Sequence, residues 1–173
     1  VYTTQAKQKW NLRHGSQWLL NAEKYSSLAW LGGENYPGVK LNSAWKLQLF
    51  NGFHDLAAGS GIGVIYKDAQ KQFNVIPWPA LEETRPELAD IDSHIDTSAH
   101  PGVPIIVWNP LSWNRADVVE ADVQMPHAEP NGISVLDADG KPVFMQVLST
   151  KANTNSYHLL LELRNVPSIG YTV

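Results

Sequence analysis

The hydrophobic period of this chain changes once along its length, and this change limits the fold more than any other feature. Up to about residue 76 the apolar residues recur at spacings of three and four, which is typical of amphipathic helices. From Val103 they recur at a spacing of two, in short runs rich in β-branched and aromatic residues. We therefore predict a segregated α+β protein: a three-helix bundle over 1–77, a linker over 78–102 and part of an antiparallel β-sandwich over 103–173.

The first predicted helix follows an N-cap at Thr3 or Thr4 and runs to about residue 31. Gly15 interrupts it, at a cost of up to about 1 kcal/mol relative to alanine. The loop GGENYPG at 32–38 ends it, because glycine and proline are strong helix breakers. Four residues at four-three-four spacing form its apolar stripe: Trp18, Ala22, Tyr25 and Ala29.

The second predicted helix begins at about Asn42 and ends by Gly59, and the third follows directly. One stripe of the second helix consists of Trp45, Leu49, Phe53 and Leu56. One face of the third consists of Ile62, Ile65, Tyr66, Ala69, Phe73 and Ile76. Three amphipathic helices joined by short loops predict a bundle.

Prolines at 77, 79 and 86 then stop helix formation, and the stretch to Pro101 has six acidic residues against the single basic Arg85. This composition predicts a linker or an extended segment over the surface. The runs predicted to be strands lie at 102–108, 116–124, 131–137, 141–149, 156–163 and 170–173. Asp139-Gly140 predicts a type I′ hairpin, in which both central residues have positive φ. We expect these strands to be a piece of a larger sandwich.

The composition excludes several classes of function. The formal net charge is -4, the charged content is 17%, and no basic stripe is present, so binding to nucleic acid or to an acidic membrane surface is not expected. No run of about 18 apolar residues predicts a membrane span. The chain has no cysteine, which excludes disulfides and thiolate metal sites but does not identify a compartment.

His54 and Asp55 are the main candidates for a functional site, in the predicted last helical turn before the glycine-rich GSGIG. Adjacent helical residues project about 100° apart, so one could bind a metal while the other contacts a substrate. Alternatively, Asp55 is solvated and His54 caps the last helical carbonyls. Spacing alone favours this second interpretation, since structural caps and ion pairs outnumber functional ones.

No other motif offers a clearer site. GSGIG at 59–63 is not a dinucleotide fingerprint, because Val64 stands where the third glycine is needed and a helix precedes it. No Gly-x-Ser-x-Gly sequence predicts a nucleophile elbow. The remaining histidines are predicted to be surface or turn residues, without metal-binding spacing: His14, His94, His100, His127 and His158.

Several stretches resemble one family in the expected order. They are YTTQAKQK with LLNAEKYSSLA, then LNSAWKLQLFNGFHDLAAGSGIGVIYKDAQ, VWNPLSWNRADVVEADV and VPSIGYTV. The block containing Phe-His-Asp is the most specific of them, and together they resemble the glycoside hydrolase family 38 α-mannosidases. The resemblance implies an N-terminal α/β catalytic domain, a middle three-helix bundle and β-sandwich domains, of which this chain contains the bundle and the start of the β region.

The resemblance also implies a site. In the family a divalent metal, usually zinc, is held by two aspartates and two histidines, which makes His54 a metal ligand and Asp55 a contact to the hydroxyls of an α-mannoside glycan. The implied reaction is retaining hydrolysis by two carboxylates about 5 Å apart. Both carboxylates and the other three ligands belong to the family's N-terminal domain, so no catalytic residue lies in this chain and it should be inactive alone. The sequence departs from the family pattern at three positions: Gly52, where the family usually has glutamine, and Leu12 and Ser16, where it has an Asn and an acid.

Two other functions are compatible with parts of the sequence. Adjacent His-Asp pairs also occur in all-helical, metal-dependent phosphohydrolases, for which His14 and Asp68 could supply further ligands, although the β-rich second half does not fit. A non-catalytic carbohydrate-binding or scaffolding module would use exposed aromatic rings for stacking. Its candidates are Trp78, Trp108 and Trp113.

Overall fold

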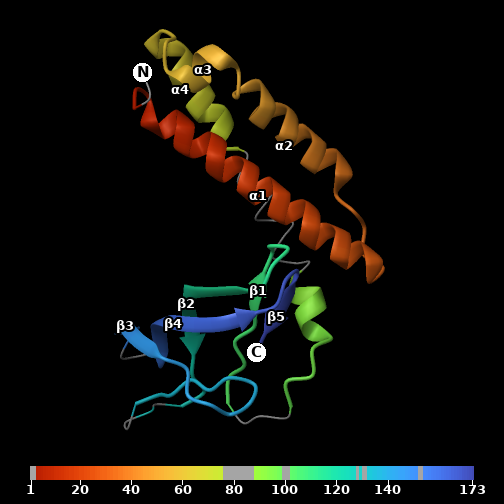
Figure 1. Ribbon diagram of the computed structural model, residues 1–173, viewed down its shortest axis with the longest axis vertical. Helices are drawn as coiled ribbons and strands as arrows, with labels where there is room; N and C mark the ends of the chain where they lie inside the picture. The colour runs from red at the N-terminus through yellow and green to blue at the C-terminus, as the bar shows by residue number, and fades with distance from the viewer. Residues whose placement is uncertain (1–2, 76–87, 99–101, 128, 130–131, 152–153) are drawn as a thin grey trace. The chain divides into compact units, whose positions relative to one another are not determined.

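The protein divides into two compact units, a helical unit Val1–Ile95 and a β unit Asp96–Val173 (Figure 1). The structure is a computed structural model that describes residues 3–75, 88–98, 102–127, 129, 132–151 and 154–173. Helices precede antiparallel strands, which confirms the predicted α+β class. The linker boundaries 78 and 102 stay a prediction, and residues 88–93 within that range are helical.

Helix α1 is Ala6–Leu31, close to the predicted length, but its N-cap is wrongly predicted. The residue at the N-cap is Gln5, which adopts a left-handed conformation with a φ of 55° and makes no side-chain cap. The Lys9 ammonium donates to the Thr4 carbonyl over 2.7 Å, and the helix begins beyond this contact. The predicted stripe is otherwise correct, since Ala22, Tyr25 and Ala29 are buried and Trp18 packs against the core.

The second predicted helix is in fact two helices, α2 at Gly38–Phe50 and α3 at His54–Ala58. Its predicted stripe is half correct: Leu56 is buried and Trp45 packs against the core, but Leu49 and Phe53 are 69% and 54% exposed. The residues of α2 that are buried are Leu41, Ala44 and Gln48.

Buried amides explain the break between α2 and α3. The Asn51 side chain donates to the Leu47 carbonyl over 2.9 Å and to Gln72 Oε1 over 2.7 Å. The Gln8 side chain donates to the Asn51 carbonyl over 2.9 Å. Because Asn51 is only 1% exposed, these contacts with α1 and α4 fix the point where the chain leaves α2.

Helix α4 spans Gly63–Phe73 and packs against α1 and α2 (Figure 1). Of its predicted face, Tyr66, Ala69 and Phe73 are buried, whereas Ile62 is 70% exposed at the N-cap and Ile76 lies outside the described residues. The predicted bundle therefore has three main helices, with α3 as a short addition. Its buried core consists of Leu19, Ala22, Leu41, Ala44, Leu56, Tyr66, Ala69 and Phe73.

Within its described residues, the β unit has two antiparallel sheets, one with the order β2-β4-β3 and one that pairs β1 with β5. Its strands are β1 Val107–Asn109, β2 Arg115–Gln124, β3 Met145–Lys151, β4 Ser156–Val166 and β5 Gly170–Thr172. In β4, alternate residues Leu159, Leu161 and Leu163 are buried, as a period of two requires. The strand predicted at 131–137 is wrong, since the described part of it makes a single bridge, Leu136 with Pro142.

The turn at Asp139-Gly140 connects paired segments as predicted, but its type differs. The Gly140 amide donates to the Asp137 carbonyl over 2.8 Å, and the Asp137 amide donates to the Lys141 carbonyl over 2.9 Å. Gly140 has a φ of 76°, while Asp139 has no positive φ. A three-residue loop of this kind needs one left-handed residue, whereas the predicted two-residue loop needs two.

A buried amide also joins two distant segments of the β unit. The Asn109 side chain, 3% exposed, donates to the carbonyls of Trp113, Val166 and Pro167 over 2.8–3.1 Å and accepts from the Leu111 amide over 3.0 Å. The loop after β1 is thereby fixed to the loop between β4 and β5.

Candidate functional site

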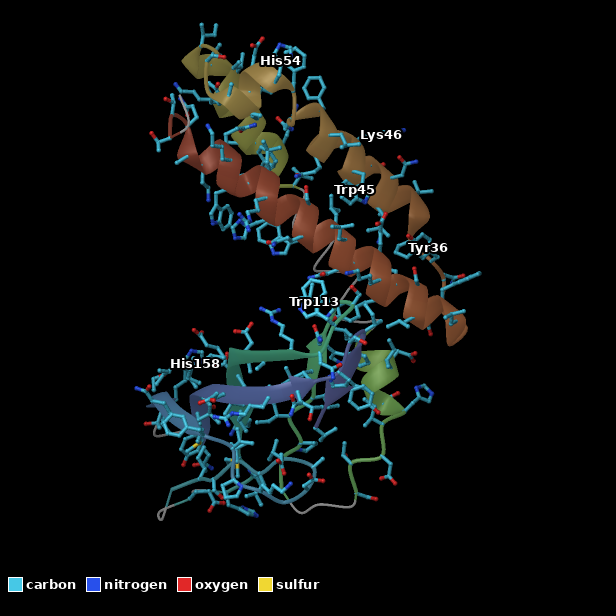
Figure 2. All side chains as sticks on the ribbon, viewed as in Figure 1. Tyr36, Trp45, Lys46, His54, Trp113 and His158 are labelled. Atoms are coloured by element: carbon cyan, nitrogen blue, oxygen red, sulfur yellow. The ribbon has the colours of Figure 1, made fainter. Side chains whose placement is uncertain are left out.

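His54 and Asp55 are the first two residues of α3, at the end of the helical unit that holds the start of α1 (Figures 1 and 2). Phe53 precedes them with φ and ψ of -51° and 139°, and its ring lies 4.2 Å from the His54 ring. The side chains of His54 and Asp55 are 79% and 58% exposed. His54 Nε2 lies 3.6 Å from Asp55 Oδ1, which is beyond hydrogen-bonding distance but within ion-pairing distance for a protonated imidazole, and both exposed groups can also reach other partners.

The predicted capping role of His54 is wrong. His54 begins α3 instead of ending a helix, because the buried Asn51 ends α2 three residues earlier. At the C-terminal end of α3, Gly59 donates to the Leu56 carbonyl and Ser60 donates to the Asp55 carbonyl, over 3.2 and 3.3 Å. The exposed imidazole therefore has no role in closing this helix.

Several elements hold α3 in place. Leu56 is buried in the core of the bundle. Lys9 of α1 donates to the Ala58 carbonyl over 3.5 Å, in addition to Thr4. Gly59 has a φ of 83°, and a Cβ there would lie 2.7 Å from the Thr4 carbonyl oxygen, so this position requires glycine.

The hydroxyl of Tyr66, from α4, makes two hydrogen bonds next to the site. It donates to the Asp55 carbonyl over 3.1 Å and accepts from the Gly61 amide over 3.0 Å. Its ring is buried in the same core, at 9% exposure. This hydrogen bond therefore connects the α3 backbone to α4 at Asp55, one of the two candidate site residues.

The His54 imidazole fits one ligand position of a metal site. An exposed neutral imidazole is a common zinc ligand, but a stable site needs three or four protein ligands. Within the part of the chain that the structure describes, no group of three or more His, Cys, Asp or Glu residues could hold a metal. His54 can therefore supply one ligand, and a complete site needs others from outside these residues.

The residues of the phosphohydrolase alternative are not brought together with His54. The His14 ring stacks on Trp10 with a centroid distance of 4.0 Å, and Asp68 pairs with Lys71 over 2.9 Å. Among the described residues, neither His14 nor Asp68 joins His54 in a group that could hold a metal.

The predicted sugar-stacking tryptophans differ in exposure. Trp108 is half-buried and lies 5.0 Å from the Tyr171 ring, while Trp113 is 59% exposed. Trp78 lies outside the described residues. Trp113, labelled in Figure 2, belongs to the β unit, whereas His54 belongs to the helical unit.

One polar cluster was missed by the sequence analysis. On the β unit, His158 Nδ1 lies 2.9 Å from Asp122 Oδ1, and His158 Nε2 lies 3.3 Å from Glu120 Oε2 (Figure 2). Asp122 and His158 are cross-strand partners in β2 and β4, 36 residues apart. This pairing depends on the register between β2 and β4, which cannot be read from the sequence.

None of the described helices combines the length and the apolar character that a membrane crossing requires.

Comparisons with known proteins place the helical unit in one family. Residues 1–78 match the family model of the alpha mannosidase middle domain. Alpha-mannosidase 2C1 from Mus musculus is 31% identical over 122 residues, and the Homo sapiens protein of the same name is 29% identical over 132 residues. Each match includes 69% of this chain, which spans only 11% of either relative.

Two solved structures from Enterococcus faecalis have a similar fold. One is an alpha-mannosidase from strain V583, with a TM-score of 0.75 and 17% identity over 97% of this chain and 23% of its own. The other is a protein in the glycosyl hydrolase family 38, with a TM-score of 0.74 and 18% identity over 95% and 23%. The middle-domain match and the curated relatives show that the chain belongs to the α-mannosidases and carries their middle domain, and the two solved structures, one of them from glycosyl hydrolase family 38, share its fold.

Proposed function

We propose that this chain is part of a retaining, metal-dependent α-mannosidase that removes terminal α-linked mannose from glycans. His54 is one ligand of a divalent metal, zinc by the family resemblance, and Asp55 accepts hydrogen bonds from hydroxyls of the bound sugar. The observation that carries the proposal is the middle-domain match over residues 1–78, which includes an exposed His54 beside an exposed Asp55.

The geometry supports a division of roles between the two residues. Consecutive helical side chains diverge by about 100°, so His54 can direct a ring nitrogen to a metal while Asp55 reaches a neighbouring hydroxyl. Both side chains are on a short helix fixed by the bundle, and a rigid support favours precise positioning of a sugar. When bound, the metal would hold sugar hydroxyls and help keep the ring distorted.

The carboxylates of the retaining reaction are not assigned to this chain. Such a reaction needs a nucleophile and an acid/base about 5 Å apart, whereas the proposed roles of His54 and Asp55 are metal binding and substrate contact. The remaining ligands and both carboxylates come from another domain of the parent enzyme. The isolated chain is accordingly inactive.

The test uses the longest polypeptide that the parent gene encodes, assayed for hydrolysis of an aryl α-mannoside and for metal content. His54→Ala should lose bound metal and activity together. Because His54 is exposed, the substitution should change the free energy of unfolding by no more than about 0.5 kcal/mol. His127→Ala, which removes another exposed histidine, is the matched control and should retain both properties. Retention of metal and activity by His54→Ala would show that this residue is not a ligand.

A further inference from the structure

The Tyr66 hydroxyl has both of its hydrogen-bonding roles engaged around α3. It donates to the Asp55 carbonyl over 3.1 Å and accepts from the Gly61 amide over 3.0 Å. A tyrosine hydroxyl has one proton to donate, so this proton is committed to the backbone of Asp55. The buried ring leaves the hydroxyl little freedom to move away.

The positions of the His54 and Asp55 side chains depend on the α3 backbone. Both side chains are exposed, and within the described residues the His54 imidazole approaches only the Phe53 ring and the Asp55 carboxylate. Helix α3 has five residues, far below the length at which an isolated helix is stable in water. Contacts with the rest of the bundle therefore decide where these two residues lie.

Three of the described contacts that anchor α3 differ in directionality. Leu56 contributes apolar burial, which is not directional. Lys9 reaches the Ala58 carbonyl at a long 3.5 Å, from a flexible side chain. Tyr66 alone among these three makes a short, directed bond to a candidate site residue and a second to the loop that follows.

We infer that Tyr66 is a positioning residue for the metal ligand and the substrate contact, acting through the backbone of Asp55. This inference rests on the proposed function of His54 and Asp55. Without the hydroxyl, α3 keeps its apolar anchor but loses a fixed orientation, so His54 meets the metal in the correct direction less often. Residues that orient a metal ligand typically contribute 10- to 100-fold in affinity, and we expect a loss of about tenfold.

The experiment compares Tyr66→Phe with Tyr25→Phe in the parent polypeptide. Both substitutions delete one hydroxyl from a buried tyrosine of the bundle, but Tyr25 lies in the C-terminal third of α1, whereas the Tyr66 hydroxyl bonds to the backbone of α3. Three properties are measured: the dissociation constant for zinc by competition with a chelator, amide hydrogen exchange over residues 54–62, and kcat and KM for an aryl α-mannoside. Exchange serves as a readout that does not depend on bound metal or on catalysis.

Tyr66→Phe should weaken zinc binding about tenfold, speed exchange over 54–62 and reduce kcat/KM, while Tyr25→Phe leaves all three near those of the unsubstituted enzyme. Unchanged zinc affinity or unchanged exchange in Tyr66→Phe overturns the inference. Equal weakening in both variants also overturns it, since a general loss of stability would then be the cause.

His54→Ala separates this inference from the proposed function. If His54→Ala loses the metal while Tyr66→Phe binds it normally, the positioning role alone is wrong. If His54→Ala retains the metal, the proposed function fails and the positioning role fails with it.

Discussion

Buried amide side chains connect the helices of the bundle. Besides Gln8 and Asn51, the Asn11 side chain donates to Gln70 Oε1 over 3.1 Å. The Gln48 side chain donates to the Leu12 carbonyl and to Ser16 Oγ over 2.5 and 2.9 Å. Sequence patterns assign Asn and Gln to the surface, where they usually occur, so these positions are not predictable from the stripes. Their bonds depend on partners from helices distant in sequence.

Tyr25 makes the stability of the protein sensitive to alkaline pH. Burial raises the pKa of its hydroxyl to about 12, because the phenolate is poorly solvated there. The folded state therefore keeps this proton as the pH rises from about 10 to about 12, while the unfolded chain loses it. The contribution of Tyr25 to stability is complete below about pH 10 and disappears as the pH reaches about 12.

Urea unfolding at about pH 8 and about pH 11 checks this prediction, and the unsubstituted chain should lose about 1–2 kcal/mol more of its free energy of unfolding than Tyr25→Phe. The variant controls for all other groups that ionise at alkaline pH, because these groups are the same in both proteins. Equal losses in the two proteins would contradict a raised Tyr25 pKa.

At the scale of elements, the sequence predicted the helices from their apolar period but misjudged where one of them ends. The amphipathic pattern continues through Asn51, Gly52 and Phe53, because periodicity records only the type of side chain at each position. The break follows from the bonds of Asn51 to α1 and α4, which exist only after these helices have packed. As a result His54 begins a helix, where the sequence predicted that it ends one.

Gly15 is a second case in which packing outweighs helix propensity. A Cβ at this position of α1 would overlap the buried Gln48 amide of α2, whose Cδ would be 3.0 Å away. Gly15→Ala should therefore lower the free energy of unfolding by about 1–2 kcal/mol, although propensity alone predicts a gain of about 1 kcal/mol.

The control is a double-mutant cycle with Gln48→Ala, which removes the overlapping group. In that background Gly15→Ala should be neutral or stabilising, so the two substitutions should be coupled by at least about 1 kcal/mol in urea unfolding. Additive effects would mean that Gly15 and Gln48 do not constrain each other.

At the scale of the whole molecule, each unit is organised by its own core. The helical core and the β core share no residue, and the change of hydrophobic period in the sequence matches the change from helices to strands. The segregated α+β class was therefore predictable. The candidate site was predictable only through family resemblance, since one histidine and one aspartate do not define a metal site by spacing.

The chain alone should bind zinc weakly and leave an aryl α-mannoside intact, because it offers one proposed ligand and no proposed catalytic carboxylate. Calorimetric titration of the 173-residue chain with zinc should give nearly the same weak signal for the unsubstituted protein and for His54→Ala. Tight binding of one zinc ion per chain, abolished by His54→Ala, would mean instead that the chain holds a complete site.

Family resemblance nominated His54 and Asp55, and the sequence by itself determined that helices precede strands and which residues form the main apolar stripes of α1 and α4. These follow from periodicity and local motifs, which involve residues close together in the chain. The tertiary structure alone decided the break before His54, the three-residue turn at Gly140 and the attachment of α3 to Tyr66. Each of these depends on backbone geometry or on hydrogen bonds between segments that meet only when the chain has folded.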